Sequence, residues 1–378
     1  MSSSGLPAPL PHPLLMGHEI FRHSSYGATH PLRIARVSTV IDLARALGWL
    51  PREAFRTSPR AKPAALTAFH TPDYLAALQR AEAEGEVSDA VRRRHGLGTF
   101  SCPVFPEVWR RPATAAGGSL WAAEALRGGG VVHNPAGGTH HGMPDYASGF
   151  CYINDAALAL KSFRRQGLER LAYVDIDAHH PDGVEHAFRD DPSVLMISVH
   201  EANRWPRTGA LADEGAGNCF NLPVPSGSGD ATYAAALDAL IGPRVEAHRP
   251  EALVVQCGAD AVVEDPQSRL GCSNRMHVSV LRALLPLSPR VLVLGGGGYN
   301  PWSVGRCWTA LWGAVRGEEV PDRLPEEAEA VLRALRWPGH RMDGRPEEPW
   351  VTTLLDEARP GEVAREVLEG LKALARRP

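Results

Sequence analysis

Short apolar runs alternate along the chain with longer amphipathic stretches. Each run has about the length of a strand that is buried on both faces, as strands of a parallel sheet are. The runs predict strands at Val131–His133, Leu171–Asp177, Val194–His200, Ala252–Gly258 and Arg290–Gly295. The amphipathic stretches predict helices at Ala35–Leu47, Pro72–Glu84, Ala113–Leu126, Asn154–Gln166, Val184–Phe188, Asp230–His248, Ser273–Leu285 and Trp302–Val315. This alternation predicts an α/β protein with a mainly parallel central sheet flanked by helices.

We find no internal repeat and no long linker, which favours a single domain. The proline-broken start predicts a mobile tail over residues 1–15, and residues 16–316 carry the predicted alternation. The charged segment 317–378 is expected to form a helical extension that packs on the same domain. The start lacks the basic region of a signal peptide.

The bulk properties narrow the class of partner. The net charge of -3 and the pI near 6.6 predict neither a nucleic-acid nor a membrane partner. No apolar run approaches the ~20 residues that cross a bilayer. The six cysteines form no CxxC pair, and several lie in apolar runs, so we expect free thiols in a cytoplasmic protein. The sequence leaves the oligomeric state open, a homo-oligomer included.

Acidic and imidazole side chains follow two of the predicted strands. Asp175, Asp177 and His179 share one face of an extended strand because side chains alternate. A solvated loop would explain one or two such residues, but it explains this density poorly. Asp260 follows another strand and by itself would be expected to cap a helix. Together with Asp177 and His179 it completes the three protein ligands of a catalytic zinc site.

A histidine pair lies between glycines. His140 and His141 could be structural or could transfer protons near neutral pH, for which the unperturbed pKa of histidine is suited. Asp175 and Asp182 are the candidate carboxylates to orient the two rings.

Four consecutive glycines precede Tyr299. Such a loop could cradle a phosphate, but it lacks the lysine and the glycine spacing of nucleotide-binding motifs. The alternative is a flexible loop that presents the Tyr299 hydroxyl to a developing oxyanion.

Taken together, these segments resemble the histone deacetylase and acetoin utilisation deacetylase superfamily, in its bacterial acetoin-utilisation branch or a class I-like relative. The matching stretches are in the family's order and extend to about residue 316. They are YGATHPLRIARV, AGGTHHGMPDYASGFCYINDAALAL, AYVDIDAHHPDGVEHAF, LMISVHE, VVQCGAD, RLGCSN and VLGGGGYNPWSVGRCWT. The resemblance implies a single-domain, three-layer arginase/deacetylase-like fold. It also implies hydrolysis of an N-acetyl amide with one Zn²⁺ per chain.

The resemblance also implies roles for individual residues. Three match the zinc ligands, His141 matches the general base beside His140, and Tyr299 matches the tyrosine that polarises the acetyl carbonyl. Asp175 would support His140 and Asp182 would support His141, with His180 nearby. The implied zinc ligands are Asp177, His179 and Asp260.

A narrow substrate tunnel is implied as well, lined by Gly149, Phe150, Trp205 and Leu270, with Arg33 at an internal channel near an acetate pocket. The sequence departs from the family's pattern at three positions. Ser101 stands where many members have an aspartate that grips the substrate backbone, Trp205 replaces a phenylalanine, and Pro181 replaces a glycine.

The resemblance further implies monovalent cation sites, usually for K⁺. The first would use Asp175, Asp177 and Ser198 with the carbonyls of His179 and Val199. The second would use carbonyls near Phe188, Asp191, Val194 and Asn218.

Two other functions remain open, an arginase-like hydrolase with two metal ions and a catalytically silent acetyl-lysine binding module. The substrate is also open between acetyl-lysine in a protein, an acetylated polyamine and another small amide. An acidic group at the tunnel mouth, where Glu264, Gln267 and Leu270 are expected, could favour a cationic amine.

Overall fold

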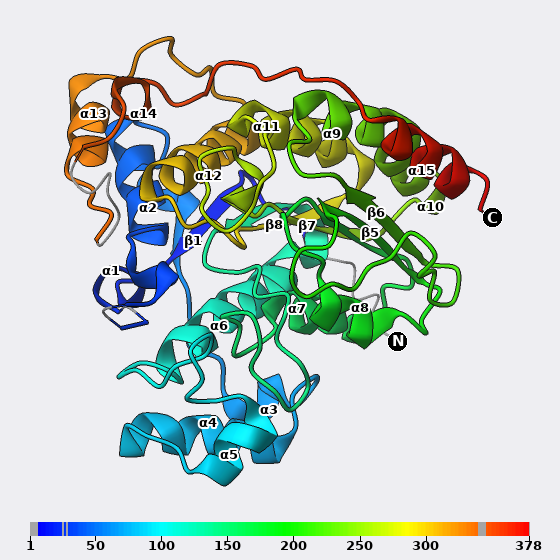
Figure 1. Ribbon diagram of the computed structural model, residues 1–378. Coiled ribbons are helices and arrows are strands. Elements are labelled where there is room, and N and C mark those ends of the chain that lie inside the picture. Colours follow the sequence, from blue (N-terminus) through cyan, green and yellow to red (C-terminus); the bar gives the residue numbers. More distant parts are fainter. Residues whose placement is uncertain (1–6, 25, 28, 339–344, 378) are drawn as a thin grey trace.

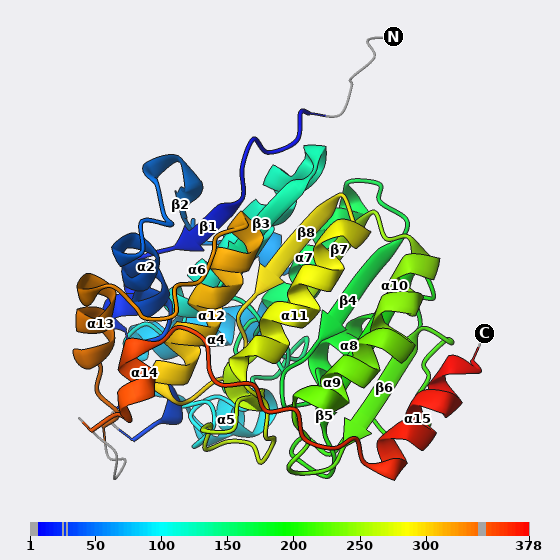
Figure 2. The ribbon, with the colours of Figure 1, turned by 90° about the horizontal axis from the view of Figure 1, so that it is seen from above.

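The computed structural model describes residues 7–24, 26–27, 29–338 and 345–377. Its centre is an eight-stranded sheet with the order β2-β1-β3-β8-β7-β4-β5-β6, and every neighbouring pair is parallel (Figure 2). The strands are β1 (Leu14–Gly17), β2 (Phe55–Thr57), β3 (Gly130–Asn134), β4 (Leu171–Asp175), β5 (Val194–Glu201), β6 (Cys219–Val224), β7 (Ala252–Gln256) and β8 (Arg290–Leu294). The predicted parallel α/β class is therefore confirmed.

The apolar runs correctly predicted five strands, β3, β4, β5, β7 and β8. They missed the other three, β1, β2 and β6. One missed strand corrects the predicted tail, because Leu14 and Leu15 are buried in β1 and pair with β2 and β3. Residues 1–6 of that predicted tail lie outside the described residues.

Helices cover both faces of the sheet (Figure 1). One layer contains α6 (Arg110–Ala125), α7 (Asp155–Arg165) and α8 (Asp182–Phe188). The other contains α9 (Asp230–Ala236), α10 (Gly242–His248), α11 (Asn274–Leu284) and α12 (Pro301–Arg316). A π-helical segment, Leu237–Ile241, joins α9 to α10, so the single predicted helix is continuous but not uniformly α. The remaining helices are α1 (Ile20–His23), α2 (Val37–Ala46), α3 (Pro63–Leu66), α4 (Pro72–Glu84), α5 (Asp89–His95), α13 (Glu326–Arg333), α14 (Glu348–Thr352) and α15 (Arg365–Ala375).

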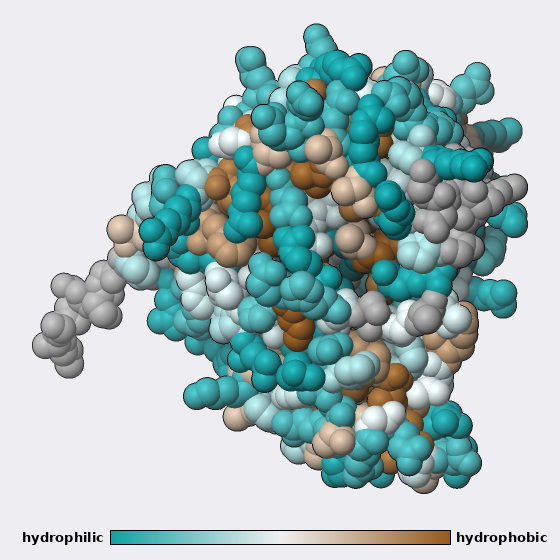
Figure 3. All heavy atoms as spheres, turned by 90° about the vertical axis from the view of Figure 1, so that its left-hand side faces the viewer, coloured by the Kyte–Doolittle hydropathy of each residue, from teal (hydrophilic) through white to brown (hydrophobic). Residues whose placement is uncertain are grey.

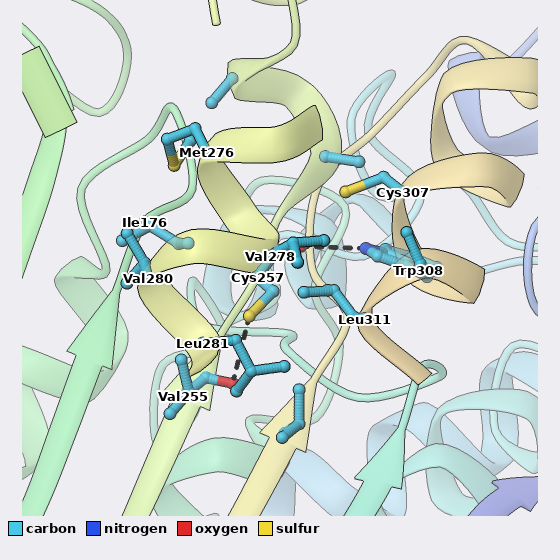
Figure 4. Close-up of a cluster of buried hydrophobic side chains, with 14 of the residues drawn as sticks. Ile176, Val255, Cys257, Met276, Val278, Val280, Leu281, Cys307, Trp308 and Leu311 are labelled. Carbon is cyan, nitrogen blue, oxygen red and sulfur yellow. Dashed lines mark hydrogen bonds between the residues drawn. The ribbon is translucent and has the colours of Figure 1, made fainter. Parts of the chain in front are cut away.

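A dense apolar core anchors the carboxyl end of β7 beneath α11 and α12 (Figure 4). Val255, Leu281 and Trp308 are fully buried there. The indole Nε1 of Trp308 donates a hydrogen bond to the carbonyl of Cys257 at 2.9 Å. Burying side chains of this size stabilises a fold by about 1.5–3 kcal/mol each. The loop that follows β7 is therefore held on a rigid support.

The segment after α12 packs on the same body. Trp302 of α12 donates to the carbonyl of Leu332 in α13 at 2.9 Å, and its ring centroid lies 5.7 Å from that of Trp350 in α14. Hydrophilic side chains cover most of the face drawn in Figure 3, with small hydrophobic patches between them. In the described part of the chain, no helix is both long and apolar enough to pass through a bilayer.

Candidate active site

Three candidate metal ligands meet at the carboxyl edge of the sheet. Asp177 and His179 follow β4, and Asp260 lies in a short 3₁₀ turn after the adjacent strand β7. His179 Nδ1 is 2.9 Å from Asp260 Oδ2 and 3.1 Å from Asp177 Oδ1. One ligand atom from each residue lies within 4.8 Å of the others, and all three residues are buried. Open α/β sheets bind ligands at this edge.

Glycines allow the backbone to approach these carboxylates. A Cβ on Gly258 would lie 1.9 Å from Asp177 Oδ2, and a Cβ on Gly297 would lie 2.0 Å from Asp260 Oδ2. The amide of Gly297 instead donates to Asp177 Oδ2 at 2.8 Å. The glycine run after β8 therefore lets the backbone lie against the carboxylates of the candidate metal site and bind one of them.

Gln256 is a site residue that sequence reasoning missed. Its side-chain amide donates to Asp177 Oδ2 at 3.1 Å, and its oxygen accepts from the Gly258 amide at 2.7 Å. A fully buried glutamine at the end of an apolar strand was the signal that could have identified it.

The charges at this point fit a divalent cation. Burial and the neighbouring Asp177 raise the pKa of Asp260 to about 6. Burial lowers the pKa of His179, but the two carboxylates outweigh burial and raise that pKa to about 10. A proton on His179 thus balances two buried carboxylates, and a metal ion held by the same three atoms would replace that proton. Two carboxylate oxygens and one imidazole nitrogen are a donor set that suits zinc.

The tandem histidines each contact a carboxylate of their own. His140 Nδ1 is 2.8 Å from Asp175 Oδ2, and His141 Nδ1 is 2.7 Å from Asp182 Oδ1. Burial lowers the pKa of His140, but Asp175 and Asp177 outweigh it and raise the pKa to about 9. Burial and the neighbouring His140 lower the pKa of His141 to about 4. The structure places both pairs as the sequence predicted, close to the candidate ligands.

The start of α7 shapes the histidine loop, which sequence reasoning also missed. Asp155 accepts from the amides of Gly138 and Thr139 at 3.0 and 2.8 Å. Asn154, the N-cap of α7, donates to the carbonyls of His140 and Gly142. Polar residues buried at a helix start, directly after an apolar segment, were the available signal.

His180, expected beside the metal ligands without binding the metal itself, contacts two side chains of the surrounding segments. Its Nε2 lies 3.0 Å from Glu185 and its Nδ1 lies 2.9 Å from the Thr208 hydroxyl. The ring therefore stabilises the loop behind the site.

Tyr299 lines two cavities that meet the candidate ligands, an inner one that also touches Asp177 and His179 and an outer one that also touches His179. Its amide donates to Asp265 Oδ2 at 2.6 Å, and its ring lies edge-on to Phe150 with centroids 5.6 Å apart. Burial raises the pKa of the phenol well above its usual value, so the hydroxyl keeps the proton that a hydrogen-bond donor needs.

The outer cavity has a volume of about 460 Å³ and leads from the surface to the site. Gly149, Phe150 and Trp205 line it, as predicted, and the Trp205 ring lies edge-on to His141 with centroids 4.6 Å apart. A Cβ on Gly149 would lie 2.3 Å from Trp205, so a side chain at this position would obstruct the cavity.

Two expectations about the mouth of this cavity are wrong. Leu270 is 2% exposed and belongs to the apolar core, whereas Gln267, which was also expected at the mouth, does line the cavity. Glu264 borders a separate surface depression together with Arg306. The loop after Asp260 turns back on itself through the Ser268 hydroxyl, which donates to the Asp260 carbonyl, and this turn carries Leu270 inward.

The inner cavity contains an arginine other than the predicted one. Arg36 donates to the carbonyls of Gly296 and Gly298 at 2.9 and 3.2 Å, and its guanidinium lies 4.9 Å from the Trp308 ring centroid. Arg33 ends a short 3₁₀ turn and bonds the carbonyl of Pro338 instead. The prediction of Arg33 is corrected to Arg36, because the turn directs Arg33 away from the cavity.

The comparisons with known proteins agree with this geometry. Residues 30–315 match the model of the histone deacetylase domain. The chain belongs to the histone deacetylase family. Histone deacetylase 3 of Oryza sativa subsp. japonica is 37% identical over 314 residues, which cover 79% of this chain and 60% of that protein. Histone deacetylase 8 of Xenopus tropicalis is 34% identical over 299 residues, covering 77% of this chain and 80% of that protein.

Solved structures resemble this histone deacetylase family member over nearly its whole length. An HDAC homolog complexed with SAHA has a TM-score of 0.91 at 32% identity, covering 96% of this chain and 100% of that chain. The HDAC homolog from Aquifex aeolicus has a TM-score of 0.90 at 31% identity, with the same coverage. The predicted arginase/deacetylase-like fold is confirmed, although the chain spans only about 60% of the first curated relatives.

The two expected monovalent cation sites differ in which groups the structure brings together at each. In the first, the sheet register sets Asp175 beside Ser198, whose hydroxyl lies 2.9 Å from His200 Nδ1. The expected members of the second do come together, but the Asn218 side-chain nitrogen occupies their centre. It donates at 2.9–3.0 Å to the carbonyls of Phe188, Asp191 and Val194.

Proposed function

We propose that this protein is a zinc-dependent deacetylase that hydrolyses an N-acetyl amide. The observation that carries the proposal is the convergence of Asp177, His179 and Asp260 beside two Asp–His pairs and a protonated tyrosine. Membership of the histone deacetylase family supports it. A zinc ion held by the three ligands would supply Lewis acidity toward the acetyl carbonyl and lower the pKa of water.

The chain's own residues would move the protons and hold the substrate. His141 would accept a proton from the attacking water, because its Nδ1 is held by Asp182 and its ring faces the outer cavity. The Tyr299 hydroxyl would donate to the carbonyl oxygen as negative charge develops there. The C–N bond then breaks, the nitrogen takes a proton from the imidazolium, and acetate and a free amine are released.

The two cavities support separate paths for the substrate and the released acetate. The acetylated amine would enter between Phe150 and Trp205, and His140 with Asp175 would form the buried side of the site. The guanidinium of Arg36 in the inner cavity offers a charge partner for the released acetate.

Metal content and acetate release, measured on the same preparation, test the proposal. We expect one zinc ion per chain and release of acetate from an acetylated amine, with both lost in Asp177→Ala. Two bound metal ions would favour the arginase-like alternative. Full zinc content and tight binding of the acetylated amine, without release of acetate, would favour the silent binding module.

The remaining expectations follow from particular observations. We propose K⁺ only at the site of Asp175 and Ser198, because the Asn218 amide already takes the carbonyls of the second site. Six free, buried cysteines support a reducing, cytoplasmic setting. The acetylated partner is an acetyl-lysine side chain or a small acetylated amine.

A further inference from the structure

The mouth of the outer cavity concentrates the exposed aromatic surface of the protein. Among the described residues, four large hydrophobic side chains are exposed: Phe100 at 78%, Trp205 at 45%, Leu368 at 43% and Tyr146 at 38%. All three aromatic members line this one cavity, and only Leu368, on α15, lies elsewhere. Clustered apolar exposure of this kind marks a binding surface, whereas single exposed residues do not.

The same mouth lacks a negative charge. Among the described residues that line it there is no aspartate or glutamate, and the only lysine or arginine is Arg204. Arg204 is neutralised by Glu201, which is 3% exposed and also accepts from the Ser226 hydroxyl and the Arg269 amide. Glu201 is therefore fully engaged, and an ammonium group would find no free carboxylate among the described residues that line the cavity.

The residues between the aromatic side chains are neutral. Ser101 contacts the Thr99 hydroxyl at 3.4 Å, and its carbonyl lies 3.3 Å from His30 Nε2. Gln267 contributes a side-chain amide to the same cavity. The mouth is thus an aromatic rim with neutral hydrogen-bonding groups, and its one charged lining residue, Arg204, is already paired with Glu201.

Beneath the rim, aromatic rings form the wall of the cavity. Trp205 packs against His141, and the absence of a side chain at Gly149 makes room for its ring. Phe150 packs against Tyr299 on the same cavity. Trp205 therefore contributes both to the inner wall and to the exposed rim. An apolar wall of this kind suits the methylene chain of a substrate, while the exposed rings at the mouth are left to contact its terminal group.

From this combination we propose that the substrate is an acetylated amine whose unbranched chain carries an uncharged aromatic or aliphatic group, which rests on Phe100, Tyr146 and Trp205. Polyamines and other cationic amines are the disfavoured class. The inference rests on the proposed deacetylase function and names the substrate class of that same site.

Three acetamides with the same chain length separate the terminal groups. They are N-acetyl-5-phenylpentylamine, N-acetyl-pentylamine and N-acetyl-cadaverine. All three have a five-carbon chain, whose last carbon carries a phenyl ring in the first, is a methyl group in the second and carries an ammonium in the third. Acetate release by the zinc-loaded protein gives kcat/KM for each. We expect the phenyl compound to exceed the cadaverine compound by about tenfold or more. Equal or faster turnover of the cadaverine compound would overturn the substrate class and leave the deacetylase function standing.

Rim variants test which residues set the preference. Phe100→Ala should reduce the ratio of phenyl to cadaverine turnover about threefold or more, because it removes apolar contact area. Ser101→Asp should raise kcat/KM for the cadaverine compound by supplying the missing carboxylate. Leu368→Ala is the matched control, an exposed hydrophobic residue away from the mouth, and should leave the ratio unchanged. An unchanged ratio in both rim variants would contradict the assignment of the rim.

A binding measurement keeps the two proposals separable. If none of the acetamides releases acetate, the proposed function fails, and calorimetry with two alkyl hydroxamates decides the substrate class. The phenyl-terminated hydroxamate should bind the zinc-loaded protein about tenfold more tightly than the amine-terminated one. Equal affinities would remove the inference.

Discussion

The rings of His140 and His141 lie 4.0 Å apart, centroid to centroid, yet each contacts a different aspartate. His140 pairs with the fully buried Asp175, which also accepts from the Tyr173 hydroxyl at 2.5 Å. His141 pairs with Asp182 at the start of α8 and lines the outer cavity beside Trp205. The two neighbours therefore face different surroundings, and of the two only His141 lines the outer cavity.

This asymmetry predicts unequal effects of substitution. His141→Gln should lower kcat by about 100-fold or more, because a positioned general base contributes about 100- to 10,000-fold. Metal analysis should show the same zinc content as the parent protein. His140→Gln is the matched comparison, and we expect a smaller loss. A larger loss for His140→Gln would assign the base to the inner histidine.

The hydroxyl of Tyr299 is expected to act only during the reaction. Tyr299→Phe keeps the ring against Phe150 and removes a single oxygen. Losing one oxyanion donor typically costs ~100- to 1,000-fold in kcat, so we expect that loss with zinc content and melting temperature nearly unchanged. Near-normal kcat in this variant would disprove the role.

Gly258 is expected to control metal affinity because of its closeness to Asp177. An added Cβ would lie 1.9 Å from the Asp177 carboxylate, so Gly258→Ala should displace that ligand. Displacing the support of a ligand typically lowers metal affinity about 10- to 100-fold, which a zinc titration against a competing chelator can measure. Gly370→Ala is the control, because an added Cβ there meets only the ends of leucine side chains at 3.2 Å and beyond. Unchanged zinc affinity in Gly258→Ala would mean that the loop can shift.

His133 is expected to make stability fall in mild acid. Its imidazole is fully buried in β3, and burial lowers its pKa to about 4 from the ordinary 6.5. Between these values the unfolded chain binds more protons, so the free energy of unfolding decreases as pH falls through 6.5 toward about 4. The full loss approaches about 3 kcal/mol.

Denaturant titrations at a series of pH values measure this effect. His133→Phe should flatten the decrease in that pH window, even if it lowers stability at neutral pH. His23→Gln is the control, because the His23 side chain is 75% exposed, and we expect it to keep the parent slope. An identical slope in His133→Phe and the parent would contradict the prediction.

The apolar runs by themselves determined the central strands, because a strand covered on both faces must be apolar throughout. The edge strand β6 was not predicted, because it is not apolar throughout. It contains Asn221 and Pro223, and a proline is tolerated in a strand at the margin of a sheet. The segment with Leu14 and Leu15 was too short beside its prolines to predict a strand, and only pairing with β3 made it one.

The local pattern also determined the candidate ligands and the Asp–His pairs, because strand alternation and the strand ends place them at one edge. Only the tertiary structure decided which residues of turns and loops face the cavities. Arg36 rather than Arg33 lines the inner cavity, and of the residues expected at the mouth only Gln267 lines the outer one. The Asn218 amide occupies the second expected cation site. The direction of a side chain in a short turn depends on the packing of distant segments around it, which no local pattern records.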